Sequence, residues 1–498
     1  MQDAQDLAVI ISAQVPIIVV ETFDEKSAQD LLLRVAREKQ KTLYRWTVTD
    51  GLQAAGFGLQ IENDVEYAEA DAVLEYLKTR AGPGIYMLCD MHPWLQDNPK
   101  AVRLIKDFAM KNDHGPSTLV LVSHRFELPP ELSRYSARFS LSLPSEMEIL
   151  SLVREEAKKW GARHNGQKVR ASNRALTGLA ATLKGLSHTE VRRLARTAIY
   201  DDGAVTEDDL PEINKAKFQL MGMDGVLSYS FESEDFSNLG GMESLKQWLH
   251  QRQDAFLLPD KSALDTPKGM LLLGVQGGGK SLAAKAVAGL WQIPMLRLDM
   301  GALYNKYYGE TERNLRDALS LADQMSPCVL WVDEIEKAIT SSEADSGLSQ
   351  RVLGTLLTWM QERTSQVFMV ATSNDVSRLP PELLRKGRFD DLFFVDLPNE
   401  TTRASIFSIH FAKRDLALEN FDISALAAAS EGFSGAEIEQ AIVSALYGAS
   451  NQPAEGQAPL GTDSVMEEIL ATSPLSQVMA EKVEALRAWA IERNVRSV

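Results

Sequence analysis

The stretch from Gly274 to Ser281 reads GVQGGGKS, between the apolar run Met270 to Leu273 and the helix-forming sequence LAAKAVAGLW. Glycines let backbone N–H groups curl around phosphate oxygens without Cβ clashes, and the N-terminus of the next helix adds free donors and a favourable dipole. A strand, a glycine-rich loop ending in Lys-Ser and a helix together form the context of a phosphate-binding loop. The alternative is a glycine-rich turn that ends in Lys-Ser by chance.

In a phosphate-binding loop, the last two residues have specific roles. Lys280 would reach the β- and γ-phosphates of ATP, and Ser281 would hold Mg²⁺. The residues expected to contact the nucleotide here are Gly274, Val275, Gln276, Gly277, Gly278, Gly279, Lys280 and Ser281.

Paired acids follow the next strong apolar strand, in the stretch CVLWVDEIE from Cys328 to Glu336. Asp333 can position the magnesium shell and Glu334 can polarise a water for hydrolysis. The alternative is a pair of acids that caps the following helix. A further apolar strand, VFMVA, ends in TSND, and we expect Asn374 to orient the same water.

Two arginines three positions apart, Arg385 and Arg388, occur in LLRKGRFDDLFFVDLP after a double proline. Negative charge on a transferred phosphoryl group is stabilised by an arginine, which another subunit often supplies. Surface charges with no catalytic role are the alternative.

The first half of the chain repeats landmarks of the second half in the same order, which is typical of a duplicated module. LPPEL occurs at 128–132 and again, 251 positions later, at 379–383. Lys26-Ser27 can be laid on Lys280-Ser281 and Asp90 on Asp333, and LKGLSHTEV lies 247 positions before SEGFSGAEI. An unrelated α/β domain with coincidental strands is the alternative.

The first copy lacks the chemistry of the second. Phe23, Asp24 and Glu25 stand where the loop has three glycines, and their bulk and charge would exclude phosphate. Met91 stands in place of Glu334, and no asparagine follows the strand TLVLVS. We therefore expect a non-catalytic first module.

The expected fold is α/β, with two modules in tandem that each have a parallel sheet, flanking helices and a helical lid. The predicted boundaries are a degenerate module at 1–220, a linker at 221–234, a large catalytic subdomain at 235–400 and a lid at 401–498. Within this lid, the Gly- and Pro-rich segment 448–463 predicts a loop.

Composition limits the function. The 498 residues include 52 basic and 69 acidic side chains, and the net charge of -17 disfavours nucleic acid as a partner. Cys89 and Cys328 have no neighbours at zinc spacing, so we expect neither a disulfide framework nor a zinc site, and a reducing cytoplasm fits. The apolar stretch LAVIISAQVPIIVV contains Ser12, Gln14 and Pro16, so we expect no membrane span and no signal peptide.

From about Asp235 to Val498, these motifs resemble the AAA ATPases, a branch of the AAA+ superfamily. The phrases LLLGVQGGGKSLAAKA, RLDMGALYNKYYGE and CVLWVDEIEK look closest to hypothetical AAA proteins of algal plastid and cyanobacterial genomes. The chain departs from the family pattern at Gln276, where proline is usual, and at Ser281, where threonine is usual; either hydroxyl can ligate Mg²⁺.

The resemblance implies further site residues and an assembly. In DFSNLGGMESLKQWL, SIH and GFSGAEIEQ, the family's adenine and ribose contacts fall on Asn238, Leu239, Gly240, His410, Gly435 and Ala436. NKYYGE places Tyr307 and Tyr308 on a loop that faces a central pore in the family, although a tyrosine pair can equally be interface packing. A hexameric ring of identical chains would follow, with Arg385 and Arg388 acting in the neighbouring site.

Three functions fit these features. The first is an ATP-driven remodeller that pulls a protein substrate with Tyr307 and Tyr308. The second is a nucleotide-dependent switch or scaffold for a regulatory partner bound by the degenerate module. The third is a nucleic-acid motor, which the net charge disfavours.

Overall fold

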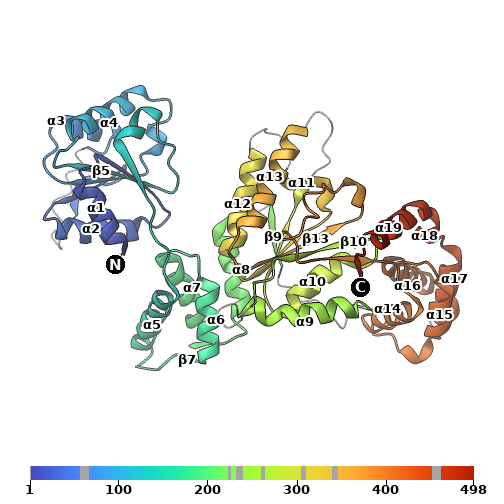
Figure 1. Ribbon diagram of the computed structural model, residues 1–498. Helices are drawn as coiled ribbons and strands as arrows, with labels where there is room; N and C mark the ends of the chain where they lie inside the picture. The colour runs from blue at the N-terminus through green and yellow to red at the C-terminus, as the bar shows by residue number, and fades with distance from the viewer. Residues whose placement is uncertain are drawn as a thin grey trace. The chain divides into compact units, whose positions relative to one another are not determined.

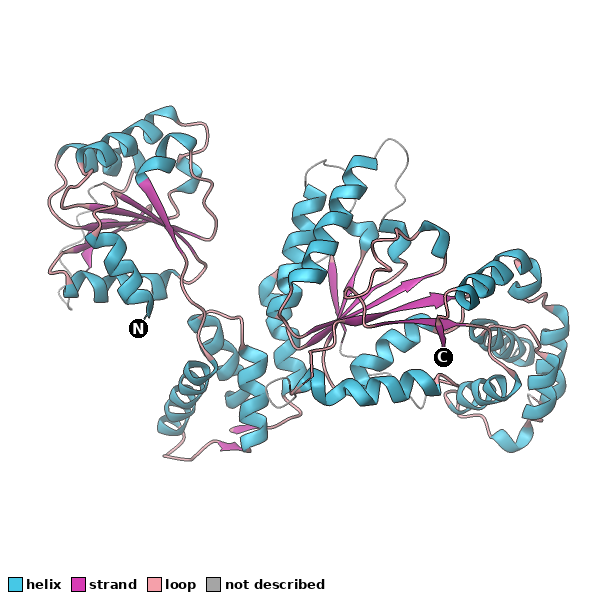
Figure 2. Cartoon of the chain, in the orientation of Figure 1, coloured by secondary structure: helices cyan, strands magenta, loops and turns pink. Residues whose placement is uncertain are grey.

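The computed structural model describes residues 2–55, 67–222, 226–230, 239–258, 264–303, 310–338, 346–450 and 461–498. The chain divides into two compact units, Met1–Glu207 and Asp208–Val498. Figure 1 colours both units along the chain, and Figure 2 separates their helices from their strands.

The N-terminal unit begins with a six-stranded sheet in the order β3-β2-β4-β5-β1-β6. Its neighbouring strands are parallel except for the hairpin between β2 and β3. The strands are β1 (Ile17–Glu21), β2 (Leu43–Thr47), β3 (Gly51–Ala55), β4 (Ile85–Cys89), β5 (Thr118–Ser123) and β6 (Ser136–Phe139).

Helices cover both faces of this sheet because its central strands are apolar on both sides. Ile18 and Val20 of β1 pack in one core with α1 (Gln2–Ser12) and α2 (Glu25–Glu38). Ile17 and Val19 point to the opposite core, with α3 (Ala70–Thr79) and α4 (Pro99–Lys111). The result is a three-layer α/β arrangement.

A helical part completes the N-terminal unit. It consists of α5 (Glu146–Arg163), α6 (Asn173–Leu183) and α7 (His188–Tyr200), with a small sheet of β7 (Arg170–Ala171) and β8 (Ala204–Val205). Its buried charge, Glu156, is paired with Lys159 and Arg196. It takes the place of the lid predicted for the first module.

The C-terminal unit is built on a seven-stranded sheet in the order β15-β14-β10-β13-β12-β11-β9. Only the edge strand β9 runs antiparallel to its neighbour. The strands are β9 (Leu227–Ser230), β10 (Gly269–Gly274), β11 (Met295–Leu298), β12 (Cys328–Val332), β13 (Val367–Ser373), β14 (Asp391–Val395) and β15 (Arg496–Ser497).

Alternate residues of β10 again face opposite layers. Met270 and Leu272 pack with α9 (Glu243–Leu257) and α10 (Lys280–Trp291). Leu271 and Leu273 pack in the other core, which includes residues of α8 (Leu210–Met221), α12 (Glu310–Gln324) and α13 (Ser346–Glu362). Figure 1 shows α9 and α10 on one side of the sheet and α12 and α13 on the other.

Four helices after β14 form a separate small core around Phe407, Phe411 and Ile442. They are α14 (Glu400–Ala412), α15 (Ile423–Ala429), α16 (Gly435–Ser450) and α17 (Thr462–Ala471). After α18 (Leu475–Val478) and α19 (Ala480–Glu492), the chain returns to the large sheet as β15, which pairs with β14. Arg487 of α19 ties this return to Asp396 through two hydrogen bonds of 2.9 and 3.0 Å.

The two units share one plan, as the repeated landmarks predicted. The order β6-β1-β5-β4-β2 matches β14-β10-β13-β12-β11 strand for strand. Each sheet also has an antiparallel edge strand beyond these, but β3 follows β2 in the chain, whereas β9 precedes β10. The two LPPEL segments also have the same local structure. Leu132 N donates to Pro129 O and Leu383 N to Pro380 O, each at 3.0 Å, and both leucines are fully buried.

The helical parts of the two units agree at the 247-residue offset. Ser187 and Glu190 form a capping box at the start of α7, in which the carboxylate accepts from Ser187 N at 2.8 Å. Ser434 and Glu437 repeat this contact before α16 at 2.7 Å. A capping box stabilises a helix start by pairing N–H groups that the helix leaves without partners.

The structure differs from the predicted boundaries at short elements. The predicted linker at 221–234 contains β9, and α8 belongs to the C-terminal unit, with Lys217 donating to Gln324 O at 2.7 Å. The predicted lid at 401–498 ends instead with β15 in the large sheet. Strands of two and four residues are too short to show periodicity, so they could not be predicted from the sequence. The helix α16 also runs through Ser450, into the predicted loop, and residues 451–460 lie outside the described part.

Among the helices that the structure describes, none has both the length and the apolar character needed to cross a bilayer.

Candidate nucleotide-binding site

The loop between β10 and α10 has the backbone geometry that its glycines permit. Gly277 and Gly279 have φ values of +77° and +91°, in the left-handed region that L residues rarely adopt. A Cβ at Gly277 would also lie 2.8 Å from the hydroxyl of Ser434, next to the lid. The loop therefore depends on the absence of side chains for both its shape and its approach to the lid.

Lys280 begins α10 and lies at the centre of this loop. Its Nζ donates to the carbonyls of Gly274 at 2.9 Å and Val275 at 2.7 Å. Burial lowers the pKa of Lys280 to about 8, and the nearby carboxylates of Glu336, Asp333 and Glu334 oppose part of this shift. The side chain is only 6% exposed, so its charge is directed into the site rather than toward bulk solvent.

The two predicted acids lie beside the adjacent strand β13. Thr372 Oγ1 donates to Asp333 Oδ1 at 2.7 Å and accepts from Glu334 N at 2.9 Å. One buried threonine therefore fixes both the carboxylate of Asp333 and the backbone of Glu334. The backbone of Glu334 is left-handed, with φ of +48°, a strained conformation for a residue with a side chain.

Asn374 is also where the sequence placed it, at the end of β13 and next to Glu334. Its Nδ2 donates to Glu334 Oε1 at 2.9 Å, and Lys337 pairs with the second carboxylate oxygen. Asn374 N in turn donates to Oε1 of Glu336, a buried side chain, at 3.0 Å. These bonds hold a carboxylate and an amide side by side at the carboxyl end of the parallel strands.

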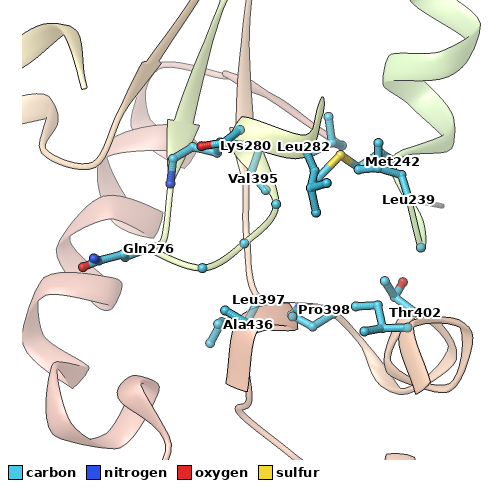
Figure 3. A pocket seen from close by; sticks show the side chains of 18 of the residues that line it. Leu239, Met242, Gln276, Lys280, Leu282, Val395, Leu397, Pro398, Thr402 and Ala436 are labelled. Carbon is cyan, nitrogen blue, oxygen red and sulfur yellow. The ribbon is translucent and has the colours of Figure 1, made fainter. Parts of the chain in front are cut away.

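A cavity of about 460 Å³ joins the loop, the acids and the lid. Figure 3 shows the loop with Gln276 and Lys280 on one side and Leu397, Pro398, Thr402 and Ala436 on the other. Ala436 N also donates to Gly277 O at 3.4 Å, which connects α16 to the loop. The predicted residues that line this cavity are Leu239, Gly240, Gln276, Gly277, Gly278, Gly279, Lys280, Ser281, Asp333, Glu334, Asn374, His410, Gly435 and Ala436.

His410 reaches the cavity from α14. Burial lowers its pKa, and Arg414, whose Nη1 lies 3.2 Å from Nδ1, acts in the same direction, while Glu439 opposes the shift. This shift favours the neutral imidazole, which can offer one donor and one acceptor. Apolar side chains, including Met242, Ile406 and Ile409, surround this end of the cavity.

Seven other predicted residues do not line this cavity or are not described. Gly274 and Val275 do not line it, but their carbonyls accept the hydrogen bonds of Lys280 Nζ. Arg385 is exposed and Arg388 is bonded to Glu382 O, and neither lines the cavity of its own chain as the structure describes it. Asn238, Tyr307 and Tyr308 lie outside the described residues.

Sequence reasoning missed three residues that shape this site. Thr372 and Glu336 are both buried. Thr372 holds Asp333, and Glu336 holds the backbone of Asn374. Ile406 lies against the backbone of Gly240, where an added Cβ would approach its Cγ1 to 2.8 Å. Glu336 was within the quoted stretch CVLWVDEIE, but its partner is 38 positions away in sequence. No local signal pointed to the pairing.

The corresponding region of the N-terminal unit corrects one detail of the predicted alignment. Three residues, Thr22 to Asp24, connect β1 to α2, whereas five, Val275 to Gly279, connect β10 to α10. The first loop is thus shorter, and Glu25 already belongs to the helix. Lys26 is therefore one position beyond the helix start that Lys280 occupies.

Asp90 shares a feature with each of the two acids of the C-terminal site. It follows β4 directly, as Asp333 follows β12. Its backbone is left-handed, with φ of +52°, as that of Glu334 is, with φ of +48°. The match of Asp90 with Asp333 stays a prediction.

The C-terminal site suits a nucleoside triphosphate with a hard divalent cation. The glycine loop leaves free the space that side chains would fill, and the buried ammonium of Lys280 offers a positive charge. The hydroxyl of Ser281 and the carboxylate of Asp333 line the same cavity and supply the oxygen ligands that Mg²⁺ prefers.

Three segments of the chain match known domain families. Residues 270–397 match the ATPase family associated with various cellular activities, abbreviated AAA. Residues 3–141 match the N-terminal domain of SpoVK-like AAA ATPases, and residues 147–224 match their second domain.

Similar proteins cover the whole chain. The uncharacterized AAA domain-containing protein ycf46 of Trieres chinensis is 33% identical over 100% of this chain and 98% of its own length. Its counterpart in Pyropia yezoensis is also 33% identical, over 100% and 99%. The proteasome-activating nucleotidase of Aeropyrum pernix is 36% identical over 43% of this chain and 54% of its own. Together with the phosphate loop and its paired acids, these matches show that the chain belongs to the AAA family of ATPases, with the ycf46 proteins as full-length relatives.

Proposed function

We propose that the C-terminal unit hydrolyses ATP and that the energy drives remodelling of a protein partner. The observation that carries the ATPase proposal is the convergence of Lys280, Asp333, Glu334 and Asn374 on one cavity. Their side chains come from the loop and from the ends of two neighbouring strands, where phosphoryl-transfer sites require a cation, a metal-binding acid and a water-polarising group.

The proposed reaction assigns a task to each side chain. Glu334, oriented by Asn374, accepts a proton from water as the water oxygen attacks the γ-phosphorus. The bond from the γ-phosphorus to the bridging oxygen breaks, and ADP and phosphate leave. Lys280 stabilises charge on the β- and γ-phosphates, while Ser281 and Asp333 would hold Mg²⁺, which would supply further positive charge against the phosphates.

Arg385 and Arg388 are proposed to complete the site of a neighbouring chain. They are not among the described residues that line their own cavity, which is what an arginine acting between subunits requires. A hexameric ring of identical chains would provide that arrangement, and we propose it on the family resemblance.

Coupling to a protein partner is proposed for Tyr307 and Tyr308. In the family that the sequence resembles, this pair faces a pore, and a matched relative is named for activating the proteasome. The net charge of -17 favours a protein rather than a nucleic acid as the partner. We place this activity in the cytoplasm.

The ATPase proposal is tested with Glu334→Gln in the full-length protein. We expect turnover to fall by about 10²–10⁴-fold, since proton acceptance is lost, while ATP affinity stays within a few fold. Asp90→Asn, which changes an acid at the corresponding strand end of the N-terminal unit, should leave turnover unchanged. Equal turnover in the wild type and Glu334→Gln would contradict the proposal.

A mixing experiment tests whether two neighbouring chains share one catalytic site. Arg388→Ala and Lys280→Ala chains should each be inactive alone and should regain part of the activity when mixed, because one supplies the loop and the other the arginine. A mixture that stays inactive argues against action between subunits.

The variant Tyr307→Ala tests the remodelling. A remodeller with this change should keep ATP turnover and lose substrate processing. If the variant still regulates its partner as the wild type does, the protein is a switch rather than a remodeller.

A further inference from the structure

The N-terminal unit gathers two histidines and an aspartate at the sheet edge that corresponds to the nucleotide site. Asp90 follows β4, His92 begins a short 3₁₀ helix (His92–Trp94), and His124 follows β5. One possible ligand atom from each residue lies within 4.8 Å of the others. Atoms this close can contact a single ion, because metal–ligand distances of about 2.0–2.2 Å allow ligand atoms up to roughly 4 Å apart after small rotations.

Neighbouring groups orient both imidazoles. Ser123 Oγ lies 2.8 Å from Nδ1 of His92 and 3.5 Å from Nδ1 of His124. The two rings meet edge to face with centroids 5.0 Å apart, and Phe23 stacks on His124 at 5.5 Å. Metal-binding histidines are commonly held by a hydrogen bond of this kind, which sets the ring orientation and tautomer.

The site corresponds in position to chemistry in the other unit. Asp90 shares the left-handed backbone of Glu334, and His124 follows its strand-end serine as Asn374 does. The N-terminal unit therefore keeps a carboxylate at this edge but has an imidazole where the C-terminal unit has an amide. The possible ligand atom at this position is therefore a nitrogen in the N-terminal unit and an amide oxygen in the C-terminal unit.

We propose that Asp90, His92 and His124 bind one divalent transition-metal ion such as Zn²⁺ or Co²⁺. Imidazole and carboxylate together suit such ions, whereas Mg²⁺ and Ca²⁺ prefer ligand sets made of oxygen. Three protein ligands leave a position for water or a small ligand. Asp90 and His124 are exposed and line a pocket with Thr22 and Glu25, so that position is open to solvent.

The prediction from cysteine spacing did not anticipate this cluster, because its members are not cysteines and His124 is distant in sequence from Asp90 and His92. His92 and His124 are 32 positions apart and come together only through the pairing of β4 with β5. The proposal concerns the N-terminal unit alone and does not depend on ATP hydrolysis.

The test is a Co²⁺ titration of the full-length, chelator-treated protein in excess Mg²⁺, which occupies oxygen sites such as that of the C-terminal unit. Visible absorption of the bound ion reports nitrogen ligation, and added Zn²⁺ should displace it. We expect one Co²⁺ per chain, with affinity lowered by roughly 100-fold in His124→Ala and in His92→Ala. Ser123→Ala should weaken binding by about tenfold, because it removes only the orienting bond.

His114→Asn is the matched control. His114 is exposed in the same unit and has φ of +64°, which asparagine tolerates, so this variant should bind Co²⁺ like the wild type. Circular dichroism checks folding, and Asp90→Asn provides a nearly isosteric variant if a histidine variant misfolds; it should also weaken binding. Unchanged Co²⁺ affinity in folded His124→Ala and Asp90→Asn, or no binding by the wild type, would overturn the proposal.

Discussion

Two loops at corresponding positions connect a strand to a helix, β1 to α2 and β10 to α10, and they differ in length and in charge. In the C-terminal unit, five residues with left-handed glycines surround a space for phosphate. In the N-terminal unit, three residues end in Asp24, whose carboxylate accepts from Ser27 N at 3.0 Å and caps α2. A carboxylate of the protein thus takes the anion position at the helix start.

Asp24 also reaches the helical part of its own unit. Its carboxylate accepts from Thr189 N at 3.1 Å and from Thr189 Oγ1 at 2.9 Å, at the start of α7. Ala436, the counterpart of Thr189 at the 247-residue offset, donates to Gly277 O instead. The comparison indicates that one unit has a permanent internal anion between sheet and helices, whereas the other leaves this role to a ligand.

The largest expected difference between the loops concerns their lysines. Lys280→Ala should lower ATP turnover by about 10³-fold, because a buried cation at the phosphates is lost. Lys26→Ala, which changes an exposed lysine of α2, should have no effect. Steady-state phosphate release measures both. Wild-type turnover in Lys280→Ala would contradict the claim that the loop of the C-terminal unit supports catalysis and that of the N-terminal unit does not.

A tenfold effect is expected at Glu336, which positions Asn374 through its backbone N–H. Glu336→Ala should lower kcat by about tenfold with little change in KM, because misplacing a water-orienting group affects the reaction more than binding. Glu336→Gln keeps the acceptor oxygen and should retain most of the activity. If kcat falls equally in both variants, the negative charge of Glu336, and not its hydrogen bond to Asn374, supports catalysis.

The pH dependence of nucleotide binding offers a smaller test. Burial lowers the pKa of Lys280 to about 8, so the ammonium loses its proton as the pH rises through this value. Since phosphate binding favours the charged form, affinity for a non-hydrolysable ATP analogue should fall by about fivefold from pH 8 to pH 9. Equilibrium binding at pH 7, 8 and 9 measures this. A constant affinity up to pH 10 would mean that the charge of Lys280 does not contribute.

The smallest effect is expected for Asp24→Ala in the N-terminal unit. Burial opposes ionisation, but hydrogen bonds from Ser27 and Thr189 outweigh it and hold the pKa of Asp24 below its usual value. A lowered folded-state pKa stabilises the fold above the unfolded value of about 3.9, and this contribution is lost as pH falls through the folded value. Asp24→Ala should therefore lower the stability of α2 by about 1 kcal/mol at pH 7, and by less at pH 3.

Urea-dependent hydrogen exchange of peptides from α2 measures this change separately from the C-terminal unit. Asp30→Ala, at an exposed position of the same helix, is the control and should have little effect at either pH. A difference between Asp24→Ala and wild type that is equally large at pH 3 would contradict an ionised Asp24.

The sequence was sufficient to predict the repeated α/β plan and the location of the nucleotide site. GVQGGGKS and DEIE are local patterns with a fixed relation to the strands before them, so Lys280 and Glu334 could be placed without a structure. Thr372 and Glu336 could not, because their partners belong to other strands and the contacts depend on register. The loop before α2 shows the same limit. Matching the two sequences placed Lys26 opposite Lys280, but α2 begins one residue before Lys26, whereas α10 begins at Lys280 itself.

The two carbonyl contacts of Lys280 have a consequence for ligand selectivity. An incoming phosphate must compete with Gly274 O and Val275 O for the ammonium, so the net gain is a difference between two sets of hydrogen bonds. Ligands that bring more anionic oxygens to this point gain most from the exchange. The loop should therefore discriminate against nucleoside monophosphates, which bring fewer anionic oxygens to Lys280.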